Sequence, residues 1–165
     1  MNIFYLNKSP EICAKEHVDK HVVKMIVEYA QLLSTAHRMI DGDQVEGKSK
    51  TGRKVKRWIL PNPNKDAIIL WLYGLFKALG HEYTYRYGKV HSTNFKLNQL
   101  LSEAPQNIKK EGWREPPPAM SHYPQCIVKG DSIQSYKNYY NEAKAYFAKW
   151  SKRETPDWFT GKATA

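Results

Sequence analysis

The stretch EHVDKHVVKMIVEYAQLL, residues 16–33, decides the fold that we expect for this chain. Apolar side chains recur through it at the three- and four-residue steps that place them on one face of an α-helix. A row of polar side chains follows similar steps along the same helix: His17, His21, Lys24, Glu28, Gln31 and Thr35. A helix with so many apolar residues is expected to lie in a core, where polar side chains are unusual. The polar row is therefore expected to have a function.

Helix signals continue on both sides of this stretch. Ser9 and Pro10 are typical of a helix start, and that helix either runs into the long one or breaks near His17. The long helix should end near Gly42, a residue suited to a helix C-terminus. Periodicity and capping residues then predict three more helices, which begin near residues 65, 92 and 131.

These elements predict an all-α fold: a compact, single-domain helical bundle of four to five helices with a short N-terminal extended segment, NIFYL. A chain of 165 residues that is 41% hydrophobic can bury one sizeable core. No interior boundary separates two cores, so residues 1–165 should form a single helical domain. Within it we expect a basic loop at 47–57, a Pro-rich irregular segment at 112–130 and a polar tail at 151–165.

The charge balance indicates the class of partner. Lysine and arginine number 26 against 16 acidic residues, which gives a net charge of +10 and a pI near 9.5. Such an excess favours polyanions, usually nucleic acid, through counterion release, and a merely solvated basic surface is the alternative. The basic loop lacks the Lys-Ser/Thr pair of a nucleotide-binding loop, so we expect it to contact a nucleic-acid backbone through Lys48, Lys50, Arg53, Lys54 and Arg57.

A second basic stretch, HEYTYRYGKVH at residues 81–91, interleaves aromatic and cationic side chains. This pattern suits stacking on exposed bases combined with phosphate contacts. We therefore predict Tyr85, Arg86 and Lys89 as DNA contacts. The alternative is that these tyrosines fill the bundle core.

The polar row of the long helix admits three interpretations. His17 and His21, four residues apart, would bind a metal ion if His81, Glu82 or His91 supplied a third ligand, although the zinc-protease pattern is absent. Alternatively, the row is a solvated stripe in which side chains pair with each other at a gain of only tenths of a kcal/mol.

The third interpretation is catalytic. Glu28 lies between apolar neighbours and would act as an acid or base in a half-buried cleft. Lys20, Lys24 or a terminal amine would be the nucleophile beside it. Burial raises the pKa of a carboxyl group and lowers that of an amine, as imine chemistry near neutral pH requires.

The segment DKHVVKMIVEYAQLL resembles the long helix of the pyrimidine-dimer DNA glycosylase family, of the phage endonuclease V type. Asp19, His21 and Glu28 stand at the spacing found in the phage enzyme. The wider family is similar at Lys20, Lys24, Glu28 and Gln31.

Two further pieces carry the resemblance. The turn containing Glu82, Tyr83, Arg86 and Gly88 is similar to the end of the family's second helix, and TPDWFTGKATA, with Trp158, is similar to its aromatic tail. Residues 92–130 have no counterpart there.

The resemblance implies an all-α enzyme that exposes a lesion in double-stranded DNA and cleaves the glycosidic bond. It implies that a primary amine attacks C1′ to form an imine, that Glu28 is the central carboxylate, and that His21 and Trp158 contact DNA. No cofactor and no metal are needed for this chemistry. Asn2 is a poor context for removal of the initiating Met, so either Lys20 or Lys24 supplies the amine or the imine chemistry is lost.

We therefore predict a DNA glycosylase, with or without abasic-site lyase activity, that acts on a damaged or modified pyrimidine. The alternatives are a non-enzymatic basic DNA-binding phage protein and a metal-dependent nuclease. No apolar run reaches the roughly 18 residues that span a bilayer, and the isolated Cys13 and Cys126 fit reduced thiols. We expect a monomer without membrane association, in the cytoplasm of a bacterial host infected by a phage.

Overall fold

The computed structural model describes residues 3–42, 65–108, 113 and 115–163. Over these residues the chain forms helices and no strand: α1 (Pro10–Glu16), α2 (Asp19–Asp41), α4 (Lys65–Tyr87), α5 (Ser92–Ser102) and α6 (Ser132–Tyr139). Three short helical turns accompany them: η2 (Pro124–Cys126), the π-helical turn η3 (Tyr140–Lys144) and the 3₁₀ turn η4 (Ala145–Phe147). The all-α prediction is confirmed, while the predicted loop at 47–57 lies outside the described residues.

Local capping chemistry sets most helix ends. The Ser9 side chain accepts a hydrogen bond from a first-turn amide, and α1 stops where His17 takes an extended conformation, so the helix breaks before α2. Gly42, at φ 92°, ends α2 as predicted. Asp131 caps α6 through its carboxylate, and His91 caps α5 through its ring.

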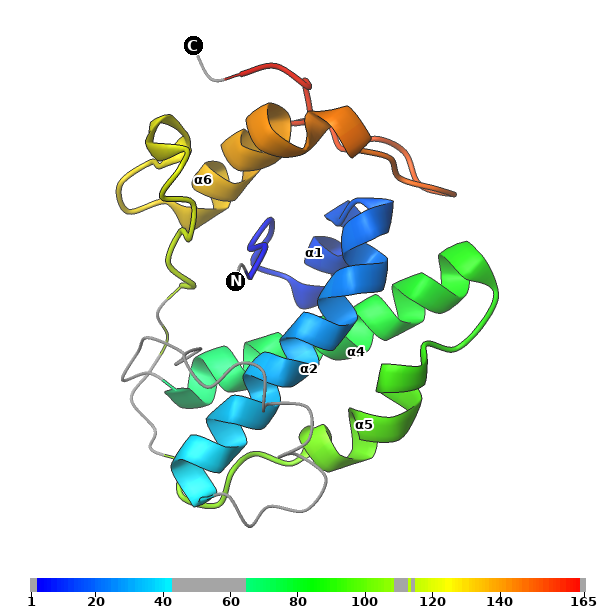
Figure 1. Cartoon of the computed structure of the whole chain (residues 1–165), viewed down its shortest axis with the longest axis vertical. Helices are drawn as coiled ribbons and strands as arrows, with labels where there is room; N and C mark the ends of the chain where they lie inside the picture. Colours follow the sequence, from blue (N-terminus) through cyan, green and yellow to red (C-terminus); the bar gives the residue numbers. More distant parts are fainter. Residues whose placement is uncertain (1–2, 43–64, 109–112, 114, 164–165) are drawn as a thin grey trace.

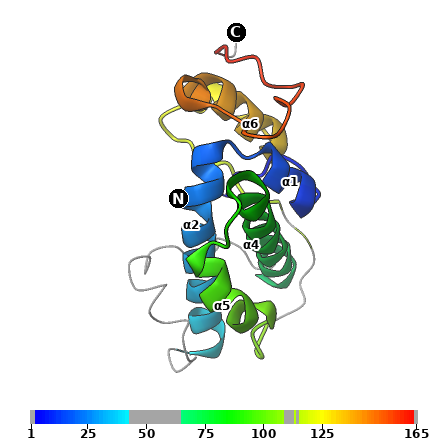
Figure 2. The same ribbon diagram turned by 90° about the vertical axis from the view of Figure 1, so that its right-hand side faces the viewer.

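The helices assemble around the pairing of α2 with α4. These two helices pack across each other, α5 lies against both, and α1 packs on α4 (Figures 1 and 2). α6 and the turns after it lie across the end of the bundle where α1 and α2 begin (Figure 1). The largest fully buried side chains include Tyr5, Leu6, Ile26, Tyr29, Leu33, Leu72, Phe76 and Tyr136.

The extended N-terminal segment is part of the core. The backbone N–H of Phe4 donates to the Tyr29 hydroxyl at 3.0 Å, and the Cys13 thiol donates to the Phe4 carbonyl at 3.1 Å. The Phe4 ring packs against Tyr136 and Tyr140, with centroid distances of 5.8 and 5.4 Å. This segment therefore joins α6 to α2, two elements that are distant in sequence.

A buried ion network joins α4 to the start of α2. The Arg86 guanidinium donates to Glu82 and Asp19, each at 2.9 Å. It also donates to the backbone carbonyls of Lys15 and His17 at 2.9 Å. Four of its five N–H groups are thus bonded inside the protein, which makes Arg86 a structural residue.

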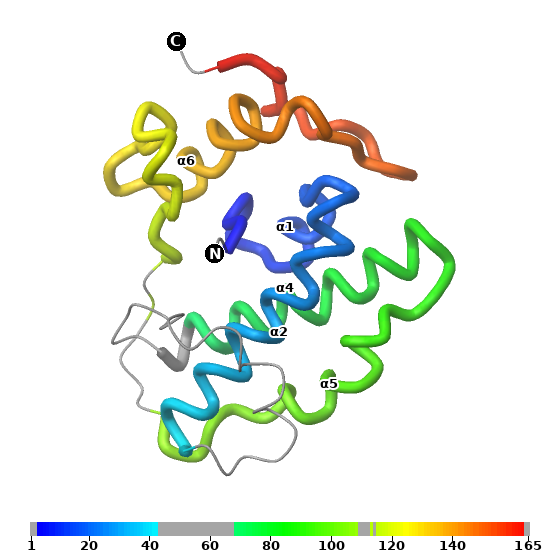
Figure 3. Tube along the Cα trace, viewed as in Figure 1, coloured from blue at the N-terminus to red at the C-terminus, as the bar shows by residue number. Residues whose placement is uncertain are grey.

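The chain after α6 extends toward the end of α4 (Figure 3). Arg153 donates two hydrogen bonds to the Glu82 carboxylate, at 2.9 and 3.0 Å. The Trp158 indole N–H donates to the Glu16 carboxylate at 2.8 Å. The segment predicted as a polar tail is therefore fastened to the body of the protein.

Candidate functional site: an amine–carboxylate cluster on α2 and η3

The polar row of α2 changes its exposure along the helix. His17, which precedes α2, and His21 in its first turn are buried, and Thr35 is buried further along the helix. Between them the Lys24 side chain is 71% exposed and the Glu28 side chain is 21% exposed. The row thus reaches the surface only in its middle, and that part is the one available for chemistry.

His17 belongs to a closed hydrogen-bond chain. Its Nδ1 lies 2.7 Å from the Cys13 carbonyl oxygen, which can only accept, so Nδ1 carries the proton. Its Nε2 therefore accepts from the Tyr29 hydroxyl at 2.8 Å. Burial lowers the pKa of His17 to about 4, which keeps the ring neutral at physiological pH. His17 has a structural role.

His21 is also an interior residue. Its Nδ1 lies 2.6 Å from the Tyr140 hydroxyl, and its ring stacks on Phe4 with centroids 4.1 Å apart and planes at 21°. Burial lowers its pKa to about 2, and the charges of Lys144 and Lys24 are among those that add to the effect. His21 is only 5% exposed, so its side chain lies in the protein interior, and its contact with DNA stays a prediction.

The metal interpretation of the row has little support. No group of three or more His, Cys, Asp or Glu side chains able to hold a metal ion exists within the part of the chain that the structure describes. The His17 and His21 rings lie 6.5 Å apart at 72°, and each is bonded to a tyrosine hydroxyl. Glu82, one of the predicted third ligands, is occupied by two arginines.

The predicted catalytic residues share one surface of α2. Lys24 Nζ lies 3.4 Å from Glu28 Oε1 in an ion pair between adjacent turns. Lys20 is exposed one turn earlier, and its Nζ lies 4.9 Å from the centroid of the Phe147 ring. The structure therefore brings all three residues together, next to an aromatic side chain from η4.

A fourth residue of this surface, Lys144, was not predicted from the sequence. It is the last residue of the π-helical turn η3 and is partly buried. Its Nζ lies 5.0 Å from the centroid of the Tyr139 ring and 5.9 Å from that of Phe147. Lys20 and Lys144 thus approach the same ring, that of Phe147, from two different elements.

The electrostatics of Lys144 connect it to α2. Burial lowers its pKa, the nearby Tyr146 opposes this shift, Lys24 adds to it and Glu28 opposes it. Lys24 and Glu28 are therefore within electrostatic reach of Lys144. We call Lys20, Lys24, Glu28 and Lys144 the amine–carboxylate cluster.

The residues predicted as DNA contacts near the end of α4 do not join this cluster. The Arg86 side chain is fully buried and its guanidinium is bonded inside the protein, and its contact with DNA stays a prediction. Tyr85 and Lys89 are exposed, and Arg153 lies 4.0 Å above the Tyr85 ring. Trp158 is partly buried against the body. The Tyr85 hydroxyl donates to the Lys152 carbonyl at 3.3 Å, so the contacts of Tyr85 lie with the chain after α6.

The remaining predicted DNA contacts lie outside the described residues: Lys48, Lys50, Arg53, Lys54 and Arg57.

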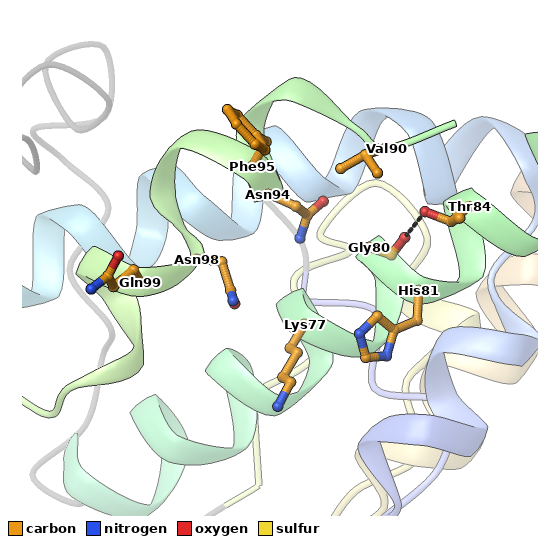
Figure 4. A pocket seen from close by; sticks show the side chains of 9 residues that line it. All are labelled: Lys77, Gly80, His81, Thr84, Val90, Asn94, Phe95, Asn98 and Gln99. Atoms are coloured by element: carbon orange, nitrogen blue, oxygen red, sulfur yellow. Dashed lines mark hydrogen bonds between the residues drawn. The ribbon is translucent and has the colours of Figure 1, made fainter. Parts of the chain in front are cut away.

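A separate pocket of about 340 Å³ lies between α4 and α5 (Figure 4). Lys77 and His81 line it from α4, and Asn98 lines it from α5. Phe95, at its edge, is 81% exposed. Asn94 also lines the pocket and is buried against α4, where its amide donates to the Phe76 carbonyl at 3.1 Å. No pattern in the sequence indicates this pocket.

Within the described ranges, no helix combines the length and the apolar character needed to cross a membrane. Comparisons of the chain with models of known protein families, with curated protein sequences and with solved structures found no match.

Proposed function

We propose that this chain is a DNA glycosylase with abasic-site lyase activity, which acts on a damaged or modified pyrimidine, of the pyrimidine-dimer type, in double-stranded DNA. The observation that carries the proposal is the placement of Glu28. Its partly buried carboxylate lies 3.4 Å from the Lys24 amine and within electrostatic reach of Lys144.

This arrangement matches the needs of the reaction. A primary amine can act as a nucleophile at C1′ of a deoxyribose, and positive charge develops on the sugar as the base leaves. A carboxylate held beside the sugar stabilises that charge, and it can afterwards accept a proton. Glu28 is suited to the second role and the lysines to the first, and neither role requires a cofactor.

The position of Glu28 also favours an enzyme over a protein that only binds DNA. The chain carries a net charge of +10, which supports a polyanionic partner. A carboxylate among lysines repels phosphate, so it weakens simple binding to the DNA backbone. A partly buried Glu28 beside exposed Lys24 is therefore better explained by chemistry than by affinity.

Borohydride trapping tests the proposal. Wild type and Glu28→Gln are incubated with duplex DNA that holds one thymine dimer or one abasic site, and covalent protein–DNA adducts are counted. Glu28→Gln should lose product by about 10²-fold or more, since that is the usual contribution of a positioned acid or base. Its affinity for the same DNA, measured at fixed salt, should stay within about twofold or rise slightly because a negative charge is removed.

Glu103→Gln is the matched control, because Glu103 is an exposed carboxylate at the end of α5. It should trap DNA like wild type. Normal turnover by Glu28→Gln, or loss of all activity on addition of a chelator, would contradict the proposal, because the imine route needs Glu28 and no metal.

A further inference from the structure

We propose that Lys144 is the amine of the cluster that forms imines, and that its substrate is the open-chain aldehyde of a deoxyribose that has lost its base. The inference deepens the proposed function and rests on it for the identity of the aldehyde. The lysines expected from the sequence, Lys20 and Lys24, then serve as DNA-facing cations.

The local backbone sets Lys144 apart from the other two lysines. α6 ends at Tyr139 and continues as the π-helical turn Tyr140–Lys144. A π turn inserts an extra residue into the helical repeat and is frequent at functional sites. In this chain the turn follows the anchoring of Tyr140, which is fully buried and bonded to His21. Lys144 is thereby brought to the surface formed by α2.

The side chain of Lys144 is also more shielded from water than its neighbours. Its Nζ lies close to the rings of Tyr139 and Phe147, at 5.0 and 5.9 Å from their centroids. Aromatic faces attract an ammonium, but they also displace its hydration water. Lys24, by contrast, has a side chain that is 71% exposed.

The charges facing Lys144 come from several elements. Burial is the largest influence on the Lys144 pKa and lowers it. Tyr146 on η4 opposes the shift, while on α2 Lys24 adds to it and Glu28 opposes it. The net effect lowers the pKa of Lys144. At neutral pH a larger fraction of Lys144 is therefore the neutral amine, which is the nucleophilic form, than for an ordinary lysine.

Lys20 and Lys24 are placed for a different role. Lys24 is committed to the ion pair with Glu28, and an ammonium in an ion pair has no lone pair for attack. Lys20 is exposed and extends over the outer ring, Phe147. Both positions suit contacts with phosphates on either side of the sugar.

The covalent step is a condensation. The lone pair of the neutral Lys144 amine attacks the aldehyde carbon C1′, and the C=O π electrons move to the oxygen. After a proton passes from nitrogen to oxygen, one water leaves and the C=N bond of the imine forms. No oxidant or reductant takes part, and hydrolysis by one water restores the lysine and the aldehyde.

The first measurement needs no DNA. The full-length protein is treated at pH 7 with limiting glyceraldehyde and cyanoborohydride, which supplies the hydride that fixes any imine as a secondary amine. Peptide mass mapping then ranks the lysines, with the chain's α-amine as the internal reference. Lys144 should carry more label than Lys20, Lys24 or Lys137. Labelling of Lys144 no faster than of Lys137 would overturn the inference.

The second measurement is borohydride trapping on duplex DNA with one abasic site, using Lys144→Arg, Lys24→Arg and Lys20→Arg. Arginine keeps the charge and cannot form the adduct. Lys144→Arg alone should lose trapping, on the order of a hundredfold or more, while DNA affinity stays within about twofold. Lys137→Arg is the matched control, since Lys137 also lies over a ring, that of Trp158, at 5.7 Å.

The two measurements separate this inference from the proposed function. If wild type traps abasic DNA but the adduct maps to Lys20, Lys24 or the terminal amine, Lys144 is not the nucleophile and the lyase proposal stands. If glyceraldehyde labels Lys144 preferentially while wild type forms no adduct with abasic DNA, the assignment of Lys144 as the reactive amine is supported and the proposed function is contradicted.

Discussion

Arg86 Nη1 donates to Asp19 Oδ1 over 2.9 Å, and this bond joins the end of α4 to the first residue of α2. The same carboxylate accepts from the Ser151 backbone N–H at 2.9 Å. Three segments therefore meet at the turn from which Lys20 and Lys24 extend. The position of the amine–carboxylate cluster depends on this interior network, although the Arg86 side chain is buried and a substrate in solution does not reach it.

Replacing Arg86 should destabilise the fold strongly. Arg86→Met leaves the Asp19 carboxylate without its arginine partner and leaves Glu82 with Arg153 alone, and breaking a buried pair in this way costs about 3–5 kcal/mol. Arg153→Met is the matched control, because the Arg153 side chain is 27% exposed and should cost less. Urea unfolding at pH 7 measures both. Equal losses in the two variants would show that burial of Arg86 is not what matters.

Stability should fall on acidification between pH 6.5 and 5. The folded pKa values of His17 and His21, about 4 and about 2, lie below the ordinary value of 6.5. The unfolded chain therefore binds more protons in this range, and unfolding becomes easier as pH falls. The loss between pH 7.5 and 5 should be about 2 kcal/mol per histidine.

Urea unfolding at several pH values tests this histidine effect. His21→Gln should flatten the pH dependence by about half, while His122→Gln replaces an exposed imidazole as the control. A slope that is unchanged in His21→Gln would argue against a neutral, buried His21.

Two glycines of α4 should respond differently to alanine. A Cβ at Gly80 would lie 2.5 Å from Asn94 Nδ2, whereas a Cβ at Gly74 would lie 3.3 Å from the nearest atom of Pro10. Both changes gain about 1 kcal/mol of helix propensity. Overpacking costs about 1–3 kcal/mol, so Gly80→Ala should be destabilising and Gly74→Ala close to neutral. Thermal unfolding compares them, and a stabilised Gly80→Ala would mean that α5 moves aside at no cost.

Both thiols should be inert in the folded protein. Burial raises the pKa of Cys13 to about 12, and burial together with Glu142 does the same for Cys126. The thiolate is the reactive form, so iodoacetamide at pH 8 should modify neither thiol until urea is added. Mass spectrometry counts the adducts. Rapid alkylation of the native chain would indicate that one of these side chains opens to solvent.

Local features of the fold were predictable because their causes are local. The Ser9, Gly42 and Asp131 helix ends depend on side-chain caps or on backbone freedom within one turn. The end of the α-helix that begins near 131 was not predictable in this way. After Tyr139 a π turn follows, and it accompanies the packing of Tyr140 against residues more than one hundred positions away.

The candidate site was predictable only in part, for the same reason. Lys24 and Glu28 are neighbours on one helix, so their pairing follows from a four-residue spacing. The burial of His21 and Arg86 could not be predicted, because it is decided by partners 119 and 67 positions away. Lys144 sits in YYNEAKAYF, where aromatic flanks were visible, but no helical period indicated that it would face α2.

The fastening of Trp158 to Glu16 bears on how this chain folds during synthesis. The two residues are 142 positions apart, so at typical elongation rates roughly 7 to 28 seconds pass between their incorporation. Over that interval the Glu16 carboxylate on α1 lacks its Trp158 donor. The carboxylate of a nascent chain therefore stays in water until the far segment emerges, which gives chaperones a long opportunity to act on this end of the bundle.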